Sequence, residues 1–266
     1  MSTAELNAAE HNTAERNTRW RDRALTALRV VFPGVCLACT GRLPPGQLID
    51  LCHACWVTLP WLRDACRQCA LPRSSCSTGS RVSRDTAELC DACRASPPLY
   101  RRSIVPLQYA DPISAWLPAF KDRMNLSCGR TLALILAAAA CDAYGTAGPD
   151  VLVPVPLAAG RIARRGHNQA VFLARHVGRI LDRPVLIRGA RRVRAVGPQR
   201  GLGRAARLTN VSGAFLASAR VAGRSVGIID DVITTGSTAT AMAEALQAAG
   251  AAEIHLLAVA RTLRSR

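Results

Sequence analysis

Short apolar runs alternate with helix-like segments over the second half of the chain. Four runs contain β-branched residues and are typical of strands covered on both faces: 151–155, 184–187, 224–230 and 253–260. Apolar residues recur at helical spacing over 170–181 and 242–249, and Gly250 stands where a helix often ends. This alternation predicts an α/β fold with a mainly parallel sheet flanked by helices, whose ligands bind at the carboxyl ends of strands.

The pattern changes near residue 95. Upstream of it the chain is rich in cysteine, whereas after the Ser-Pro-Pro at 96–98 the cysteine density falls and the alternation begins. A length of 266 residues suits one main domain with a smaller appendage. We therefore expect a polar N-terminal extension at 1–35, a Cys-rich domain at 36–95 and the α/β domain at 96–266.

The apolar segments are too short to span a membrane. The longest run, 132–141, has ten residues against the roughly 20 that a bilayer requires, and so predicts a core helix. The first 20 residues are polar and resemble neither a signal peptide nor an anchor. We expect no membrane insertion and a cytoplasmic location.

The charge is strongly basic and carried by arginine. The net charge of +17 comes from 34 arginines and the single lysine Lys121 against 18 acids. Fifteen of the arginines lie in 161–224, where Asp182 is the only acid. Such a field would attract nucleic acid or phosphorylated ligands, although an arginine-rich solvated surface explains it equally well.

Cysteine usage indicates metal binding. Eleven cysteines without a secretion signal favour metal ligands over disulfides, because the cytosol keeps thiols reduced. Eight of them form four C-x-x-C pairs: Cys36 and Cys39, Cys52 and Cys55, Cys66 and Cys69, and Cys90 and Cys93. Two such pairs complete a tetrahedral shell of thiolates, so we expect one or two structural Zn²⁺ ions that supply folding energy.

The sequence does not decide which two of these four pairs bind the same metal ion. Gaps of 12, 10 and 20 residues suit consecutive pairing into two ribbons as well as a cross-braced arrangement. Cys76 and His53 are further donors that could substitute for a ligand.

Two adjacent acids end the apolar run near residue 229. Asp230 and Asp231 are followed by a Thr- and Ser-rich loop at 234–238, and a helix is expected to start near Ser237. Carboxylates at the end of a buried strand cost desolvation energy unless they bind something, while the N–H groups of a helix N-terminus bind phosphate. A phosphosugar would satisfy both, whereas the simpler alternative is a pair of loop or capping carboxylates.

The acid pair lies in a motif that resembles a known family. Residues 225–237, SVGIIDDVITTGS, resemble the phosphoribosyl pyrophosphate (PRPP) motif of type I phosphoribosyltransferases. Segments 153–174 and 194–215 and the paired C-x-x-C units resemble the ComF family, competence protein F and its relatives. The formal G-x-G-x-x-A at 201–206 follows a polar segment instead of a strand, so it does not indicate a dinucleotide site.

The resemblance implies a type I phosphoribosyltransferase fold after a double zinc ribbon, and it implies residue roles. Asp230 and Asp231 would be the catalytic pair that contacts the ribose hydroxyls. The residues implied to bind PRPP are Thr234, Thr235, Gly236, Ser237, Thr238, Arg161 and Arg165. The candidates for acceptor or mobile-loop contacts are Asn168, Gln169, Gln199 and Arg207. His167 replaces the aromatic residue that is usual in the family's R-G-x-N-Q element.

The implied reaction is a pentosyl transfer, in which Mg²⁺ and arginine neutralise the departing pyrophosphate and the acceptor is unknown. The family also implies a role in competence and DNA uptake. One alternative is a non-catalytic accessory that holds single-stranded DNA on 161–224 and uses the PRPP site as a sensor. Another is a docking protein whose zinc module binds a helicase-like competence partner.

Overall fold

The computed structural model describes residues 34–73, 89–145, 147–158, 160, 162, 165–193 and 213–263. The chain forms two compact units that divide between Thr58 and Leu59. The first unit holds the first two C-x-x-C pairs, and the second holds the other two pairs together with the sheet. This division falls between the two cysteine groups and so coincides with neither of the expected domain limits at 35 and 95. Those two limits stay a prediction.

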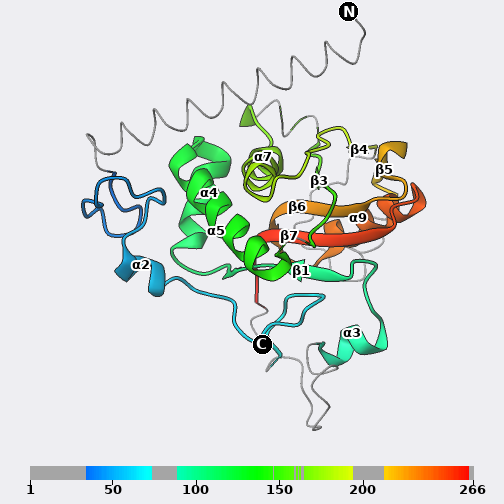
Figure 1. Ribbon diagram of the computed structural model, residues 1–266, viewed down its shortest axis with the longest axis horizontal. Coiled ribbons are helices and arrows are strands. Elements are labelled where there is room, and N and C mark those ends of the chain that lie inside the picture. Colours follow the sequence, from blue (N-terminus) through cyan, green and yellow to red (C-terminus); the bar gives the residue numbers. More distant parts are fainter. Residues whose placement is uncertain are drawn as a thin grey trace, which may run out of the picture. The chain divides into compact units, whose positions relative to one another are not determined.

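A five-stranded parallel sheet forms the core of the second unit (Figure 1). Its strand order is β1 (Arg102–Ile104), β7 (Glu253–Arg261), β6 (Ser225–Ile233) and β3 (Val151–Pro154), and all these neighbours pair in parallel. The short β2 (Leu107–Gln108) pairs in parallel with the end of β7. The predicted parallel α/β fold is confirmed.

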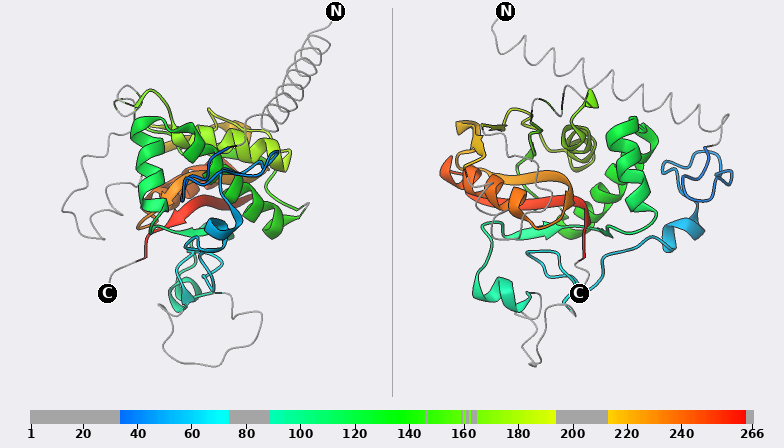
Figure 2. Two further views of the ribbon diagram at one scale, coloured as in Figure 1. Left: turned by 90° about the vertical axis from the view of Figure 1, so that its left-hand side faces the viewer. Right: turned by 180° about the vertical axis from the view of Figure 1, so that it is seen from behind.

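Helices cover both faces of this sheet (Figures 1 and 2). α5 (Leu126–Tyr144) and α7 (Gln169–Leu181) pack on one face, and α9 (Ser237–Ala248) packs on the other. Successive residues of a strand point to opposite faces, so Val153 joins the buried cluster formed with α9 while Leu152 contacts α7. This double cover explains why β3 and the central residues of β6 and β7 are apolar.

The predicted strand at 184–187 is wrong. Within this segment Val185 forms an isolated parallel bridge with Leu152. Pro184 has no N–H to donate, although its carbonyl accepts a 2.9 Å hydrogen bond from the Leu152 N–H. Gly178 of α7 packs directly above, where a Cβ would lie 2.7 Å from the Val185 side chain.

The remaining described elements are short apart from α4 (Ile113–Arg123). The one-turn helices α2 (His53–Val57) and α3 (Asp91–Ala95) follow cysteines. An antiparallel pair of β4 (Ala190–Arg192) and β5 (Phe215–Ala217) precedes the 3₁₀ turn η2 (Ala219–Val221).

α5 is the one described helix whose length and composition would allow it to cross a membrane. Half of its apolar window is buried within the protein, as in the core helix of a globular domain. Leu132 and Leu136 have no exposed surface at all. The apolar run at 132–141 therefore belongs to a packed helix, as predicted.

Candidate functional site

The acid pair lies within the carboxyl-terminal half of β6. This strand runs to Ile233, beyond the predicted end at 230, because its last residues continue to pair with β7. The N–H of Asp231 donates a 2.8 Å hydrogen bond to Oδ1 of Asp230. Burial, followed by the charge of Asp231, raises the pKa of Asp230 to about 7. The pair is therefore costly to keep doubly ionised.

The loop after the strand opens α9, as predicted. Gly236 is its N-cap residue and has a φ of 87°, a left-handed conformation that side chains disfavour. The hydroxyl oxygens of Thr235 and Ser237 lie 2.7 Å apart. Nη1 of Arg261 donates a 2.8 Å hydrogen bond to the Thr234 carbonyl. Hydroxyls and first-turn N–H groups thus converge in an arrangement that suits an anion.

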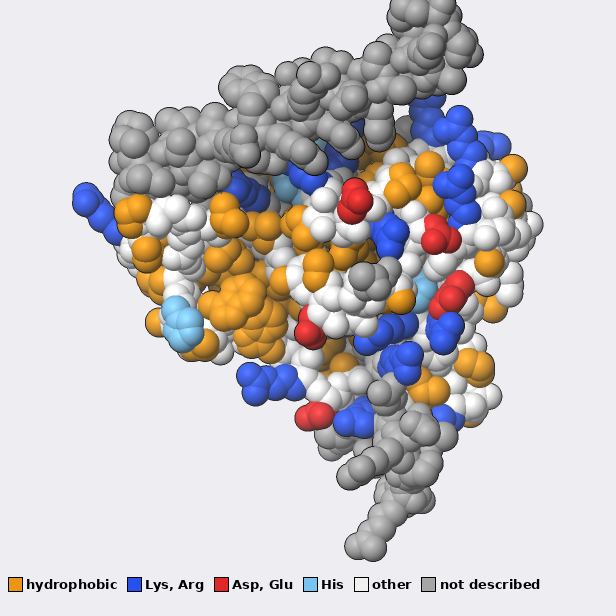
Figure 3. All heavy atoms as spheres, in the orientation of Figure 1, with side chains coloured by type: hydrophobic (Ala, Val, Ile, Leu, Met, Phe, Trp, Pro, Cys, Tyr) orange, Lys and Arg blue, Asp and Glu red, His pale blue; other side chains and the backbone are white. Residues whose placement is uncertain are grey.

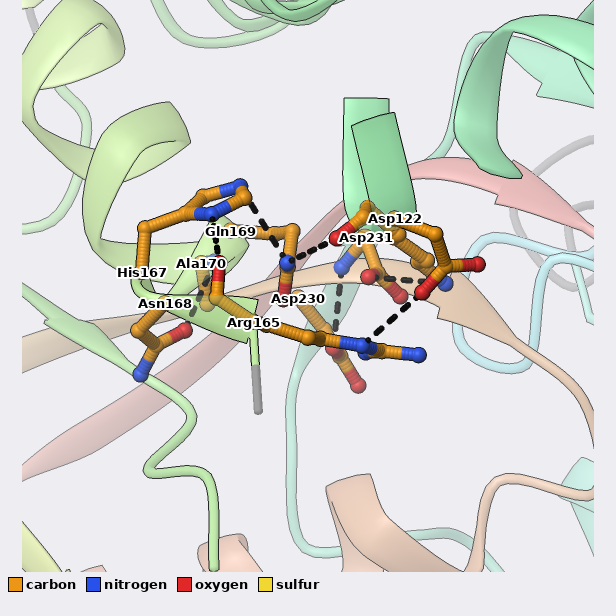
Figure 4. A network of polar contacts seen from close by, with 9 residues as sticks. Asp122, Arg165, His167, Asn168, Gln169, Ala170, Asp230 and Asp231 are labelled. Atoms are coloured by element: carbon orange, nitrogen blue, oxygen red, sulfur yellow. Dashed lines mark hydrogen bonds and ion pairs between the residues drawn. The ribbon is translucent and has the colours of Figure 1, made fainter. Parts of the chain in front are cut away.

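The chain's single lysine contacts the second acid. Nζ of Lys121, near the end of α4, lies 2.8 Å from Oδ2 of Asp231, and the two side chains are only 22% and 17% exposed. The next residue, Asp122, pairs with Nε of Arg165 at 3.1 Å (Figure 4). Nε2 of Gln169 donates to the Lys121 carbonyl at 3.3 Å. The end of α4 therefore joins the acid pair to the R-G-H-N-Q turn.

The sequence motifs predict no site role for Lys121 or Asp122. One feature of the sequence does distinguish Lys121: it is the only lysine in a chain that has 34 arginines. A compact ammonium fits a single carboxylate oxygen, whereas arginine presents a planar fork.

The R-G-H-N-Q turn is held by its own polar groups (Figure 4). Asn168 caps α7 by accepting a 2.9 Å hydrogen bond from the Ala170 N–H, and its Nδ2 donates to the Val155 carbonyl at 3.1 Å. The ring of His167 lies 5.6 Å from that of Phe120, in a tilted arrangement. These contacts give Asn168 and His167 structural roles, and an acceptor role for Asn168 or Gln169 stays a prediction.

Three predicted site residues lie outside the described residues, together with one spare donor: Arg161, Gln199, Arg207 and Cys76. The acid pair, the loop at 234–238 and Arg165 lie within the described residues, and Lys121 and Asp122 link the first of these to the last.

The eight predicted cysteine ligands form two groups by consecutive pairing. Cys36, Cys39, Cys52 and Cys55 compose the first, and Cys66, Cys69, Cys90 and Cys93 the second, with the sulfur atoms of each group within 4.8 Å of one another. Sγ of Cys39 and Cys52 lie 3.8 Å apart, and Sγ of Cys69 and Cys90 lie 3.7 Å apart. Tetrahedral Zn–S bonds of about 2.3 Å require sulfur separations of about 3.8 Å, so both groups fit Zn²⁺.

The two groups share one local structure. The N–H of Cys52 donates to Sγ of Cys36 at 3.4 Å, and the N–H of Cys90 donates to Sγ of Cys66 at 3.3 Å. A hydrogen bond from the Cys69 thiol lowers the pKa of Cys66 to about 4. Backbone N–H groups act in the same direction, and burial acts against them. The fold thus favours a thiolate at Cys66, whereas the same contact raises the pKa of Cys69 and burial raises that of Cys93.

An acid pair before a Thr-Thr-Gly-Ser loop, on a parallel sheet that follows two zinc ribbons, defines a protein of the phosphoribosyltransferase fold with a double zinc ribbon. Residues 132–266 match the phosphoribosyl transferase domain family, and residues 27–94 match the double zinc ribbon domain family.

Two curated proteins are similar to this chain in sequence. The DNA utilization protein YhgH of Escherichia coli K12 is 32% identical over 234 residues, 87% of this chain and 98% of that protein. Competence protein F of Haemophilus influenzae is 35% identical over 181 residues, 66% of this chain and 79% of that protein. Among solved structures, a glutamine PRPP amidotransferase from B. subtilis is similar to this chain with a TM-score of 0.32 and 24% sequence identity. The matched region covers 47% of this chain and 24% of that chain. On the sequence matches, the chain belongs to the ComF family of competence protein F and its relatives.

Proposed function

We propose that the chain binds PRPP at the carboxyl end of β6 and transfers its phosphoribosyl group to an acceptor. The observation that carries this proposal is the acid pair Asp230 and Asp231, kept near the end of a buried parallel strand directly before the loop that opens α9. Carboxylates accept hydrogen bonds from sugar hydroxyls, and the loop suits a phosphate. A ribose 5-phosphate unit meets both requirements.

The reaction breaks the bond between the ribose anomeric carbon and a pyrophosphate oxygen, and a lone pair of the acceptor forms the new bond. Asp230 and Asp231 would orient the ribose and stabilise the positive charge that develops on its ring. Arg165 would neutralise charge on the departing pyrophosphate. The carboxylate oxygens fit Mg²⁺, which when bound supplies further neutralisation of the pyrophosphate.

The test is calorimetric titration of the zinc-loaded protein with PRPP and Mg²⁺. We expect binding by the unaltered chain and a loss of about 100-fold or more in an Asp230→Asn/Asp231→Asn variant, since hydrogen bonds to two charged groups are removed. Asp142→Asn, an exposed acid on α5, is the matched control and should bind normally. Absence of binding by the unaltered chain, or equal binding by the double variant, would refute the proposal.

A second candidate is a non-catalytic accessory of DNA uptake that uses the PRPP site as a sensor. The names of the relatives, a DNA utilization protein and competence protein F, favour it. Its partners would be single-stranded DNA on 161–224 and a helicase-like competence protein on the zinc module, in a cytoplasm that keeps thiols reduced.

Turnover separates the two candidates. Pyrophosphate release from PRPP in the presence of a nucleobase or amine would identify a transferase. Lack of release with every acceptor, combined with a change of DNA affinity on adding PRPP, would identify a sensor.

A further inference from the structure

A cavity lies beside β1, apart from the acid pair. Its volume is about 330 Å³, and its walls come from the loop of the second cysteine group, from 102–106 and from Ala139 of α5. None of these residues belongs to the site proposed for PRPP. β1 and β3 stand at opposite ends of the strand order, so the cavity and the Arg165 turn, which follows β3, border different parts of the sheet.

The two chain segments that enclose the cavity are tied together at both ends. At one end the Ser103 N–H donates to the Arg67 carbonyl at 2.7 Å, and the Ser103 hydroxyl donates to the Gln68 carbonyl. At the other end the Leu62 N–H donates to the Pro106 carbonyl at 2.8 Å. The cavity is therefore preformed, and a ligand would not have to order its walls.

The lining is basic. Arg67, Arg73 and Arg102 contribute to it, and among the described residues that line it none is acidic. Arg73 also pairs at 3.3 Å with Asp64, an exposed residue outside the lining, so the charge of Arg73 is partly compensated. Arg102 is held in place by a 2.6 Å hydrogen bond to the Ala143 carbonyl and lies over the Tyr144 ring at 5.5 Å. Basic side chains gather over β1 in the space-filling view (Figure 3). The fixed guanidinium of Arg102, with Arg67 in the same lining, presents N–H donors that match the oxygen atoms of a phosphate.

The rest of the wall is apolar. Leu62, Ile104, Val105 and Pro106 face the cavity together with Ala139. Ile104 and Val105 are 7% and 8% exposed, so this wall belongs to the packed core. A ligand that fits must join an anionic group to a small apolar or planar body.

We propose that this cavity binds a nucleotide unit, with the phosphate at the arginines and the base against the apolar wall. The volume lies near the lower limit of small-molecule sites and favours a pyrimidine nucleotide. The same chemistry is offered by a free nucleoside monophosphate and by one nucleotide of a single strand. Because Cys66 also lines the cavity, an occupant would contact the second cysteine group directly.

The experiment uses the zinc-loaded full chain carrying Asp230→Asn/Asp231→Asn, so that the outcome does not depend on PRPP binding. Thymidine 5′-monophosphate, inorganic phosphate and an eight-residue oligothymidylate are titrated separately by calorimetry. Arg67→Gln should weaken nucleotide binding about tenfold, because one charged hydrogen-bonding group is lost. Ala139→Phe should fill the cavity and abolish binding. Arg63→Gln, an exposed arginine of the same segment outside the lining, should change nothing.

Each outcome decides the proposal. Saturable binding of the mononucleotide with this variant pattern supports a free nucleotide as ligand. The same pattern with the oligothymidylate alone supports a nucleotide within a strand. Phosphate binding as tight as nucleotide binding, binding that both variants leave unchanged, or binding by none of the three probes overturns it. Melting curves of both variants verify that they are folded.

Discussion

The charges of the acid pair are only partly compensated. Lys121 lies 2.8 Å from Asp231, whereas Asp230 receives the N–H of its neighbour. The burial of Asp230 and its like-charged neighbour outweigh these contacts, because its pKa is raised to about 7. Such a pair lowers the stability of the unliganded fold, which is the usual cost of a binding site prepared for a ligand.

We expect Asp230→Asn to raise the melting temperature more at pH 8 than at pH 5. The folded pKa of about 7 exceeds the ordinary value of 3.8, so the folded chain binds more protons between these values. The contribution of this group to the free energy of unfolding therefore falls as the pH rises from 3.8 to about 7. Asparagine does not ionise, so the variant does not lose this stability. A gain of a few degrees at pH 8 corresponds to about 1 kcal/mol.

Differential scanning calorimetry of the zinc-loaded proteins checks this expectation. Comparing variant and unaltered chain at each pH cancels any effect of pH on zinc binding. Glu244→Gln, an exposed acid of α9, serves as the control. An equal change in melting temperature at both pH values would contradict the raised pKa.

The ion pair between Lys121 and Asp231 is expected to contribute to stability. Both side chains are mostly buried, so removing one partner leaves the other poorly solvated. A double-mutant cycle with Lys121→Gln and Asp231→Asn should give a coupling free energy of about 1–3 kcal/mol in denaturant unfolding. The exposed pair Arg101 and Glu253 is the matched comparison and should couple by less than about 1 kcal/mol. Equal coupling in both pairs would argue against the burial effect.

Helices and strands with strong local signals could be predicted, and those decided by distant partners could not. β6 and α9 follow from an apolar run, a glycine-containing loop and helical spacing. The strand expected at 184–187 is reduced to a bridge, because Pro184 lacks an N–H and its neighbours form a turn. The contact of Lys121 with Asp231 joins residues 110 positions apart, so only packing could reveal it.

The cysteine groups show the same limit. Their eight ligands could be identified from spacing, but consecutive and cross-braced pairing use the same residues, and only the fold distinguishes them. The structure also reveals a repeat, since Cys36 and Cys66 each accept the N–H of the third cysteine of their group. That repeat depends on backbone conformation and not on similar intervening residues.

We expect two Zn²⁺ ions per chain, and loss of one in each of two double variants. Cys36→Ser/Cys39→Ser removes the first site and Cys66→Ser/Cys69→Ser the second. The second variant should lower the melting temperature of the sheet more, because the loop after Leu59 is hydrogen-bonded to Ser103 and Pro106 beside β1. Metal analysis and circular dichroism measure both effects. Cys141→Ser, an exposed cysteine of α5, should retain two ions, and a single ion in the unaltered chain would contradict the expectation.

The net charge of +17 acts over longer distances than any one of these contacts. A field of this strength attracts polyanions whether or not the acid pair holds a ligand. Part of the arginine-rich segment 161–224 lies outside the described residues. Whether this segment binds polyanions is therefore tested by the salt dependence of binding. Salt dependence is the property that distinguishes contacts to phosphates from stacking on bases.

The chain should bind a 30-residue oligothymidylate with an affinity that falls steeply with salt. Six phosphate contacts would lower the affinity about 300-fold between 50 and 200 mM salt, because each contact to a single strand contributes about 0.7 to the logarithmic slope. Arg188→Gln/Arg191→Gln, two exposed arginines of the segment, should reduce the slope by up to about 1.4. Arg42→Gln/Arg63→Gln, equally exposed but outside it, should leave the slope unchanged. Fluorescence anisotropy measures all three, and a flat salt dependence of the unaltered chain would mean that the basic segment does not hold nucleic acid.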